Sequence, residues 1–477
     1  MRLALRALIA VALLVGAYVL AFAVLAGTVV LGILVLHSPN GGAIKLLILA
    51  VLACAALLRG LWAGLRTGRG GDDLGLAVSR DAQPELWATV DRLATAVGTR
   101  GPDEIRLIPA VNAAVKEESS MLGLKHGKRV MYIGIPLVEA FSSAELQAVL
   151  AHELGHYSGG HTALGPVVYR GHTALEQVII HLRRRPLVQR LFVAYAKLFF
   201  RVSNAVSRRQ EFEADASAAA IAGAGPTVSA LSRLPSVTAA WQFFLEKYVV
   251  PPVQINVVPN GLASGFRSLI SEPQRQQELA AIGVKQEVAS PYDTHPPLHE
   301  RIAVLRGTTT AGPDDSPPAR TLLRNLDAIE ASMPGLLLDQ PLPAVSWDEA
   351  ATRVAAAQAG AATEALLRAA TASGGTATVS GVLDLLAAGK ADELAAALMP
   401  QGSAPDRRNA LRWALQAVVT TRLAADGKAS WTVSWTGAPW QPAGPGFAKT
   451  EAQIDAAVAD PDAVPALRRS LERLGVS

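Results

Sequence analysis

Apolar residues dominate the first part of the chain. Residues 7 to 36 carry no charged side chain, and a helical run of that length spans about 30 Å of hydrocarbon. A second apolar stretch, from about residue 42 to 65, has Lys45 and Arg59 near its ends, where long basic side chains can reach the lipid headgroups. The pattern predicts a transmembrane helical hairpin over residues 1–70.

Basic residues flank this predicted hairpin on one side. Arg2, Arg6, Arg66 and Arg69 lie at its outer ends, whereas the connecting residues 37–42 carry no formal charge and have turn chemistry. The positive-inside rule then favours an integral protein of the inner or plasma membrane whose main part is cytoplasmic. A cleaved signal peptide is the competing interpretation, but the apolar region is about twice as long as is usual for one.

An amphipathic helix is predicted over residues 142–157. Ser142 and Glu145 have the S-x-x-E spacing of a capping box, in which each side chain accepts a backbone N–H of the first turn. Apolar residues then recur at intervals of three and four up to Leu154, as on the buried face of a helix. This predicted helix carries the most informative motif of the chain.

His152-Glu153-Leu154-Gly155-His156 is an H-E-x-x-H sequence. Because a helix has 3.6 residues per turn, His152 and His156 lie on one face and both imidazoles can reach one metal ion. Glu153 is offset by about 100° around the helix, beside the metal, where it can act as general base toward metal-bound water. Catalytic zinc usually has three protein ligands and one open position, so one ligand remains to be found.

Two candidates compete for the third ligand. One is a third histidine, as in H-E-x-x-H-x-x-G-x-x-H, but that position holds Thr162, and His161 is one residue short. The other is a carboxylate from the segment Ser207–Asp215, in which Glu211 and Asp215 are four residues apart. On a helix, one carboxylate could bind the metal while the other accepts the free N–H of a ligating imidazole, preferably that of His152. The alternative interpretation is an exposed charged face.

Three blocks of sequence, taken in order, carry a resemblance to a known family. They are residues 145–156, the segment Ser207–Asp215, and Thr294-His295-Pro296-Pro297 with Arg301-Ile302. Together they resemble the M48 family of zinc metallopeptidases, which includes the bacterial HtpX-like heat-shock proteases and the Ste24 CAAX-type proteases. The resemblance covers about residues 80 to 306.

This resemblance implies a gluzincin-type zinc peptidase domain with a small β-sheet, one Zn²⁺ per chain and polypeptide substrates. It implies that His152, His156 and Glu211 bind zinc, that Glu153 is the catalytic base, and that Asp215 supports a ligand from behind.

The resemblance also implies residues for substrate. His295 and Arg301 match a histidine and an arginine that face the family's cleft, where they would donate to the oxyanion formed during hydrolysis. Asn112 and Ala113 match the segment on which substrate lies as an added strand; Ala114 follows where the family often has an aromatic residue.

Residues 187–206 are apolar and aromatic but are interrupted by Arg190, Lys197 and Arg201. Three charges make a full membrane span costly. Two interpretations remain, an amphipathic helix lying on the membrane surface and a core helix of the soluble part.

The last third of the chain has a different pattern. Residues 307–320, rich in Thr, Gly, Pro and Asp, predict a linker, and residues 321–426 have alanine and leucine at helical spacing. Trp431, Val433 and Trp435 alternate as in a short strand. The expected fold class is mainly α (α+β). Its expected parts are a hairpin anchor (1–70), a peptidase domain (71–306), a linker (307–320) and a mostly helical C-terminal domain (321–477).

Composition agrees with a membrane protein, since hydrophobic residues make up 50% of the chain and the net charge is +4. Arginines beside an anionic membrane leaflet explain the positive net charge better than nucleic-acid binding does, because the sequence has no nucleic-acid-binding motif. The expected function is that of a membrane-anchored zinc endopeptidase in membrane or misfolded-protein quality control. A non-catalytic, chaperone-like binding protein with a structural zinc site and a CAAX-type processing protease remain as alternatives.

Overall fold

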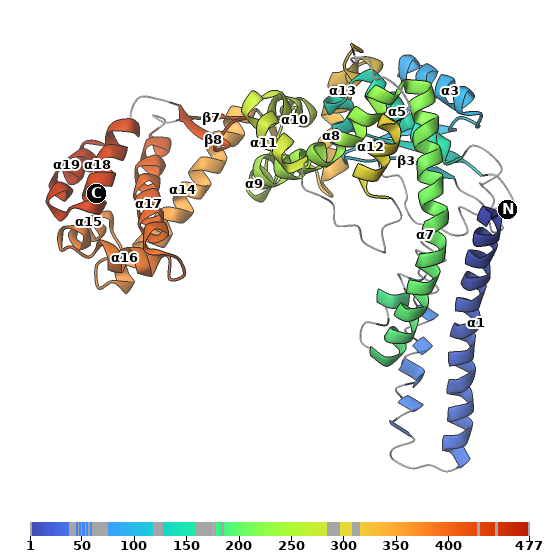
Figure 1. Ribbon diagram of the computed structural model, residues 1–477. Coiled ribbons are helices and arrows are strands. Elements are labelled where there is room, and N and C mark those ends of the chain that lie inside the picture. The colour runs from blue at the N-terminus through green and yellow to red at the C-terminus, as the bar shows by residue number, and fades with distance from the viewer. Residues whose placement is uncertain are drawn as a thin grey trace. The chain divides into compact units, whose positions relative to one another are not determined.

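The computed structural model (Figure 1) divides into two compact units, each described by itself. The first contains Met1–Ala239 and Leu279–Ser332, and the second contains Ala240–Glu278 and Met333–Ser477. The predicted domain boundaries remain predictions. The residues described are 2–37, 44–45, 47–48, 50–52, 54–55, 58–59, 75–117, 127–157, 175, 178–180, 182, 186–283, 296–307, 315–426, 430–443 and 447–475.

The first unit begins with a long apolar helix, α1 (Arg2–His37). Among the described residues, it alone is long and apolar enough to cross a membrane, over Val19–His37. About half of the predicted second span lies outside the described residues. Cys54 within it is described, and its Sγ lies 3.0 Å from Thr28 Oγ1 of α1. The second apolar stretch therefore meets α1 at this point.

The first unit contains a four-stranded sheet. Its order is β1-β2-β4-β3, with β1 and β3 each antiparallel to its neighbour and β2 parallel to β4. Ile105, Leu107, Met131 and Ile133 are fully buried in the two central strands. The strands are β1 (Leu76–Val78), β2 (Glu104–Ile108), β3 (Ala113–Glu117) and β4 (Arg129–Gly134).

The helix predicted over 142–157 is present as α5 (Ser143–Gly155), and its capping box is confirmed. Ser142 Oγ accepts the Glu145 N–H at 3.1 Å, and Glu145 Oε2 accepts the Ser142 N–H at 2.8 Å. Glu145 is buried and also accepts hydrogen bonds from Ser229 and Arg233, each at 2.6 Å. Ser229 and Arg233 belong to α8 (Ala224–Phe244), so these contacts hold the start of α5 against α8.

One 37-residue helix, α7 (Pro186–Ala222), runs through the first unit. Figure 1 shows α7 as one continuous helix. Its first half packs against α1 and its second half against α5. The helix predicted over residues 187–206 is therefore present, and its apolar side contacts α1. The remaining helices that begin in this unit are α3 (Pro84–Val97), α4 (Ile135–Ala140), α12 (Leu298–Arg306), the 3₁₀ turn Ala319–Leu322 and α13 (Leu326–Leu337).

The end of the predicted linker is tied to the peptidase part. Ser142 and Pro318 form an isolated antiparallel bridge, and the Ala319 N–H donates to the Phe141 carbonyl at 2.9 Å. Residues 308–314 of the predicted linker lie outside the described residues.

The second unit is mostly helical. Its main core lies between α14 and α17, with Leu366, Leu411 and Leu415 buried. The elements are a π-helical turn (Leu245–Val249), α9 (Val250–Gln254), β5 (Val258–Pro259), α10 (Leu262–Ser271), α11 (Pro273–Gly283), β6 (Ala344–Val345), α14 (Trp347–Ala372), α15 (Val379–Ala387), α16 (Ala391–Leu398), α17 (Ala404–Ala425), β7 (Ser430–Val433), β8 (Trp440–Ala443), α18 (Phe447–Ala459), a 3₁₀ turn (Pro461–Ala463) and α19 (Val464–Arg473).

The alternating tryptophans of this unit are only partly in a strand. Trp431 is buried within β7, which pairs with β8, but β7 ends at Val433 and Trp435 lies beyond it. Trp435 stacks instead on Tyr248 at a ring distance of 5.1 Å. The mainly α fold class with small sheets is confirmed.

Candidate metal centre

Two helices bring three potential metal ligands together. His152 and His156 come from α5, and Glu211 comes from α7. Their ligand atoms all lie within 4.8 Å of one another. The two Nε2 atoms are 3.2 Å apart, and the two carboxylate oxygens of Glu211 lie 3.6 Å from His152 Nε2 and 3.4 Å from His156 Nε2.

The close approach of α5 and α7 depends on small residues. Gly155, inside the H-E-x-x-H motif, faces Ala214 of α7, and a Cβ added at Gly155 would lie 3.3 Å from the Ala214 Cα. A larger side chain at either position would push the two helices apart, because contacts that short are rarely tolerated between rigid backbones. The spacing of the helices, and with it the reach of Glu211, is thus set locally.

Asp215 lies one helical turn beyond Glu211, behind His152. Its Oδ1 lies 3.0 Å from His152 Nδ1, and its side chain is buried. A hydrogen bond donated by Nδ1 leaves the lone pair of Nε2 for a metal ion. Burial raises the pKa of Asp215, but hydrogen bonds from Arg301 and His152 outweigh it and lower that pKa to about 2. Asp215 is therefore ionised at neutral pH.

Arg301 of α12 is buried beside these carboxylates. Its Nε and Nη2 donate to the two oxygens of Asp215 at 2.8 and 2.6 Å, and its Nη1 lies 3.2 Å from Glu211 Oε2. Burial lowers the pKa of Arg301, but the hydrogen bond to Asp215 and the nearby carboxylates raise it above its ordinary value. The oxyanion role that the resemblance implies for Arg301 stays a prediction; in the structure its guanidinium group pairs with two buried carboxylates.

The structure describes some of the other expected site residues and not others. Glu153 is half-buried on α5, and its charge is among those that raise the pKa of Arg301. His295 and the rival ligand His161 lie outside the described residues. Asn112 is exposed just before β3, and Ala113 begins that strand opposite Ile133.

One contact near the motif has no sequence signal. The Tyr157 hydroxyl, just after α5, donates to the Val115 carbonyl of β3 at 2.6 Å. The guanidinium of Arg129 lies over the same ring, 4.7 Å from its centre. The two hydrogen-bonded residues are 42 positions apart, so only the fold reveals that the edge strand is tied to the end of the helix that carries His152 and His156.

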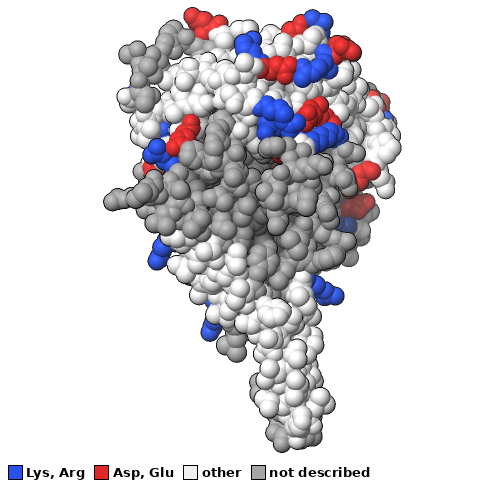
Figure 2. Space-filling view, turned by 90° about the vertical axis from the view of Figure 1, so that its right-hand side faces the viewer, with Lys and Arg blue, Asp and Glu red and all other residues white. Residues whose placement is uncertain are grey.

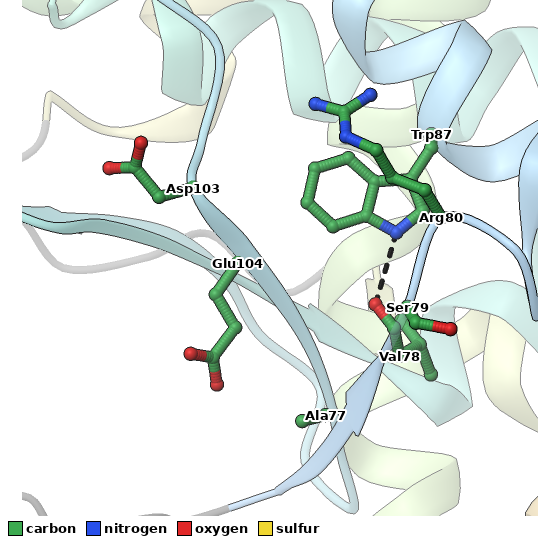
Figure 3. A pocket seen from close by; sticks show the side chains of 7 residues that line it. All are labelled: Ala77, Val78, Ser79, Arg80, Trp87, Asp103 and Glu104. Atoms are coloured by element: carbon green, nitrogen blue, oxygen red, sulfur yellow. Dashed lines mark hydrogen bonds between the residues drawn. The ribbon is translucent and has the colours of Figure 1, made fainter.

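A pocket of about 340 Å³ lies elsewhere in the first unit. Figure 3 shows Arg80 over the ring of Trp87, whose Nε1 donates to the Val78 carbonyl at 3.0 Å. The pocket contains none of the expected site residues. Its lining residues are Ala77, Val78, Ser79, Arg80, Trp87, Asp103 and Glu104.

Comparison with known proteins agrees with the metal-site geometry. The sequence profile of peptidase family M48 matches residues 80–309. This part of the chain belongs to peptidase family M48. Three relatives with the name Protease HtpX are similar. That of Pseudomonas paraeruginosa strain PA7 is 28% identical over 242 residues, or 47% of this chain and 72% of the relative. Those of Pseudomonas syringae (26%; 46% and 70%) and Hahella chejuensis (26%; 47% and 73%) follow.

The M48 match confirms the family resemblance for residues 80–309, and it supports a metalloprotease in general. The matched range contains both histidines of the motif, Glu153, Glu211 and Arg301. No solved structure matches the chain.

Replacing Asp215 by asparagine is expected to weaken zinc binding about 10- to 100-fold, because the partner that orients His152 loses its charge. Competition with a chromophoric chelator would measure the affinity. Glu213→Gln is the matched control, since Glu213 lies on the same helix but pairs with Arg209 at the surface. Equal affinity in Asp215→Asn and Glu213→Gln would remove Asp215 from the metal site.

Proposed function

We propose that the protein is a membrane-anchored zinc endopeptidase in which His152, His156 and Glu211 bind one Zn²⁺ and Glu153 is the general base. The main support is that the potential ligand atoms of these three side chains lie within 4.8 Å of one another. Glu153 directly follows the first of them, His152, in the sequence. Membership of family M48 supports it.

The three side chains suit zinc. Two imidazole nitrogens and a carboxylate oxygen are a ligand set typical of catalytic zinc, which keeps a fourth position open. They come from two helices whose spacing is set at Gly155, and one imidazole already has a buried anionic partner. Such a partner fixes the ring orientation and raises the basicity of the ligand.

Bound zinc would supply Lewis-acid chemistry, polarising the scissile carbonyl and lowering the pKa of water. Glu153 takes the proton of the attacking water and returns it to the departing amine, as its place beside the two histidines allows. Asp215 holds His152 in the tautomer that presents Nε2. Arg301 keeps Asp215 ionised and balances the charge of Glu211.

Substrate would bind as a strand along β3. This strand is at one edge of the four-stranded sheet and packs beside α5, and exposed edges bind extended peptides through backbone hydrogen bonds. Ala113 would supply backbone hydrogen bonds, since the Asn112 carbonyl accepts the Gly134 N–H and the Val115 carbonyl accepts the Tyr157 hydroxyl. Asn112 would contact substrate through its exposed side chain. His295 would then donate to the oxyanion.

Tyr157→Phe is expected to raise the KM for peptide substrates about fivefold, with kcat and zinc content little changed. The reason is the loss of one neutral hydrogen bond, about 1 kcal/mol, that holds the edge strand against α5. Steady-state kinetics on a fluorogenic peptide would measure both parameters. A variant whose KM matches the wild type would show that this contact does not position the substrate strand.

The anchor and location are part of the same proposal. Helix α1 would hold the catalytic domain at the membrane, with its main part in the cytoplasm as the flanking arginines favour. Residues 71–306 would form the peptidase domain, followed by a linker (307–320) and a helical C-terminal domain (321–477). The biological role would be cleavage of misfolded membrane or soluble proteins.

Cleavage of casein by the detergent-purified full chain tests this function. A zinc chelator should abolish cleavage, and added zinc should restore it. Stable binding of unfolded casein without cleavage at any zinc concentration would refute the endopeptidase and favour a chaperone-like binding protein.

A further inference from the structure

Three segments of the first unit meet just after α5. Tyr157 follows that helix, Thr99 comes after α3, and Val115 lies in the middle of the edge strand β3. The Tyr157 carbonyl accepts a hydrogen bond from Thr99 Oγ1 at 2.9 Å, and the Tyr157 hydroxyl donates to the Val115 carbonyl at 2.6 Å. One further side chain, that of Arg129 at the start of β4, contacts all three segments.

Few apolar contacts hold the edge strand β3. It is last in the strand order of its sheet and pairs there with β4. Of its five residues, Val115 alone is buried. A strand with an open edge and little buried apolar surface is easily displaced. Polar contacts therefore decide how firmly β3 is held.

Arg129 joins β4 to the end of β3 through a buried ion pair. Glu117, the last residue of β3, lies directly opposite Arg129 in the register of the two strands. Arg129 Nη2 donates to Glu117 Oε2 at 2.9 Å, and Nε donates to the same oxygen at 3.3 Å. The two side chains are only 6% and 13% exposed. The pair fixes the register, because a slip by one residue would move Glu117 to the other face of the sheet.

The guanidinium group of Arg129 also contacts the segments beside β3. Its Nη1 donates to Thr99 Oγ1 at 3.2 Å and to the Arg100 carbonyl, and the group lies 4.7 Å from the centre of the Tyr157 ring. The backbone of Arg129 is held as well, because its N–H donates to Asp103 Oδ2 at 2.7 Å and its carbonyl accepts the Asp103 N–H at 2.8 Å. Arginine suits this place, since its flat group can pair with a carboxylate and stack on a ring at once.

An exposed arginine of the same unit gives a comparison. Arg80 pairs with Asp91 and lies 4.1 Å from the centre of the Trp87 ring, but the side chains of Arg80 and Asp91 are 57% and 42% exposed. Basic and acidic side chains lie next to one another in the upper part of the face drawn in Figure 2. Solvent screens such exposed pairs, whereas a buried pair that loses one partner leaves an uncompensated charge. Arg129 thus differs from Arg80 in burial and not in the kinds of group that it contacts.

We propose that Arg129 is a positioning residue for peptide binding, which holds β3 against Tyr157 and so keeps the open edge of the strand in place for substrate. A ligand that needs an ordered template binds more weakly when the template is in place for only a fraction of the time. The inference rests on the proposed binding of substrate along β3. It adds a residue that acts through Glu117 and Tyr157 and that no motif of the sequence marks.

The test is the equilibrium binding of a fluorescein-labelled casein peptide to the detergent-purified full chain, measured by fluorescence anisotropy. All proteins carry Glu153→Gln, so that the peptide is not cleaved. Arg129→Lys is compared with Arg80→Lys, because each change keeps the charge and removes a guanidinium group from a carboxylate and a ring. Hydrogen exchange followed by mass spectrometry on the same samples reports whether β3 is held.

We expect Arg129→Lys to weaken peptide binding about tenfold, because hydrogen bonds between charged groups that hold the strand are lost. Exchange should become faster in Ala113–Glu117 and stay as in the parent protein in α5. Arg80→Lys should change neither quantity.

Unchanged peptide affinity in Arg129→Lys would overturn the proposal. So would weaker binding without faster exchange in β3, or with faster exchange throughout the first unit, because Arg129 would then not act on the strand in particular. If Arg129→Lys does not fold, Glu117→Gln weakens the same pair from the β3 side and should also reduce affinity about tenfold. Unchanged affinity in that variant would equally overturn the proposal.

Two readouts separate this inference from the proposed function. Binding is measured without cleavage, so a protein that binds the peptide and never cleaves it would refute the endopeptidase and leave the result for Arg129 valid. A parent protein that binds no peptide would overturn the inference itself. In the active protein, Arg129→Lys should raise KM about tenfold with kcat and zinc content unchanged. A lower kcat at constant KM would overturn the positioning role, because a partly unfolded sample gives that result.

Discussion

Glu153→Gln should keep about one zinc per chain and lose peptide cleavage by at least a hundredfold, and up to ten-thousandfold. Glutamine has nearly the shape of glutamate but cannot accept the proton of the attacking water. Glu153 is not among the three converging residues, and the start of α5 is held by the capping box of Ser142 and Glu145. Metal binding and the fold should therefore survive. Casein cleavage and zinc content would be measured on the same sample.

The zinc content of the Glu153→Gln variant shows whether a loss of cleavage comes from a loss of metal. A variant with full zinc and substantial turnover would exclude Glu153 as the base. A variant that loses zinc and activity together would instead make Glu153 part of the metal site, which its offset of about 100° from His152 around α5 does not favour.

Glu211→Ala is expected to lose zinc during purification, and activity with it. The substitution removes one of three protein ligands, and it leaves Arg301 Nη1 without the carboxylate that lies 3.2 Å away. Unbalanced positive charge beside the two histidines would further disfavour a cation. Inductively coupled plasma mass spectrometry of the purified protein would give the zinc content.

Glu213→Ala is the matched comparison, because Glu213 is two residues further along α7 and half-exposed. It should retain both zinc and activity. Full zinc occupancy in Glu211→Ala would reject Glu211 as a ligand and reopen the choice of a histidine such as His161.

The sequence was most informative where the determinants are local. The capping box at Ser142 and Glu145 and the apolar spacing after it predicted α5 to within two residues at its end, because helix caps and periodicity depend on neighbours in sequence. The proximity of His152 and His156 follows from the helical repeat for the same reason.

Contacts between distant segments could not be predicted in this way. Arg301 is 86 residues from Asp215, and a motif match gives its position but not its hydrogen bonds. Tyr157 and Val115 are joined only because α5 ends beside an edge strand. Pairings of this kind depend on how the whole unit packs, which no single stretch of sequence encodes.

The division of the chain into two compact units could not be predicted from local sequence either. Residues 240–278 lie inside the M48 range, yet they belong to the second compact unit. There β5 pairs in parallel with β6, so that Val258 lies opposite Ala344. Glycine, proline and threonine content indicates where a chain can be a linker, but it does not show which earlier segment a later domain packs against.

The zinc K-edge X-ray absorption spectrum of the purified full chain reports the atoms around the metal and therefore shows whether the two histidines bind zinc. We expect about one zinc per chain, bound only by nitrogen and oxygen at about 2.0–2.2 Å, with the scattering pattern of two imidazoles that disappears on His152→Ala and His156→Ala substitution. A spectrum without imidazole, or one that is unchanged in those variants, would contradict this expectation.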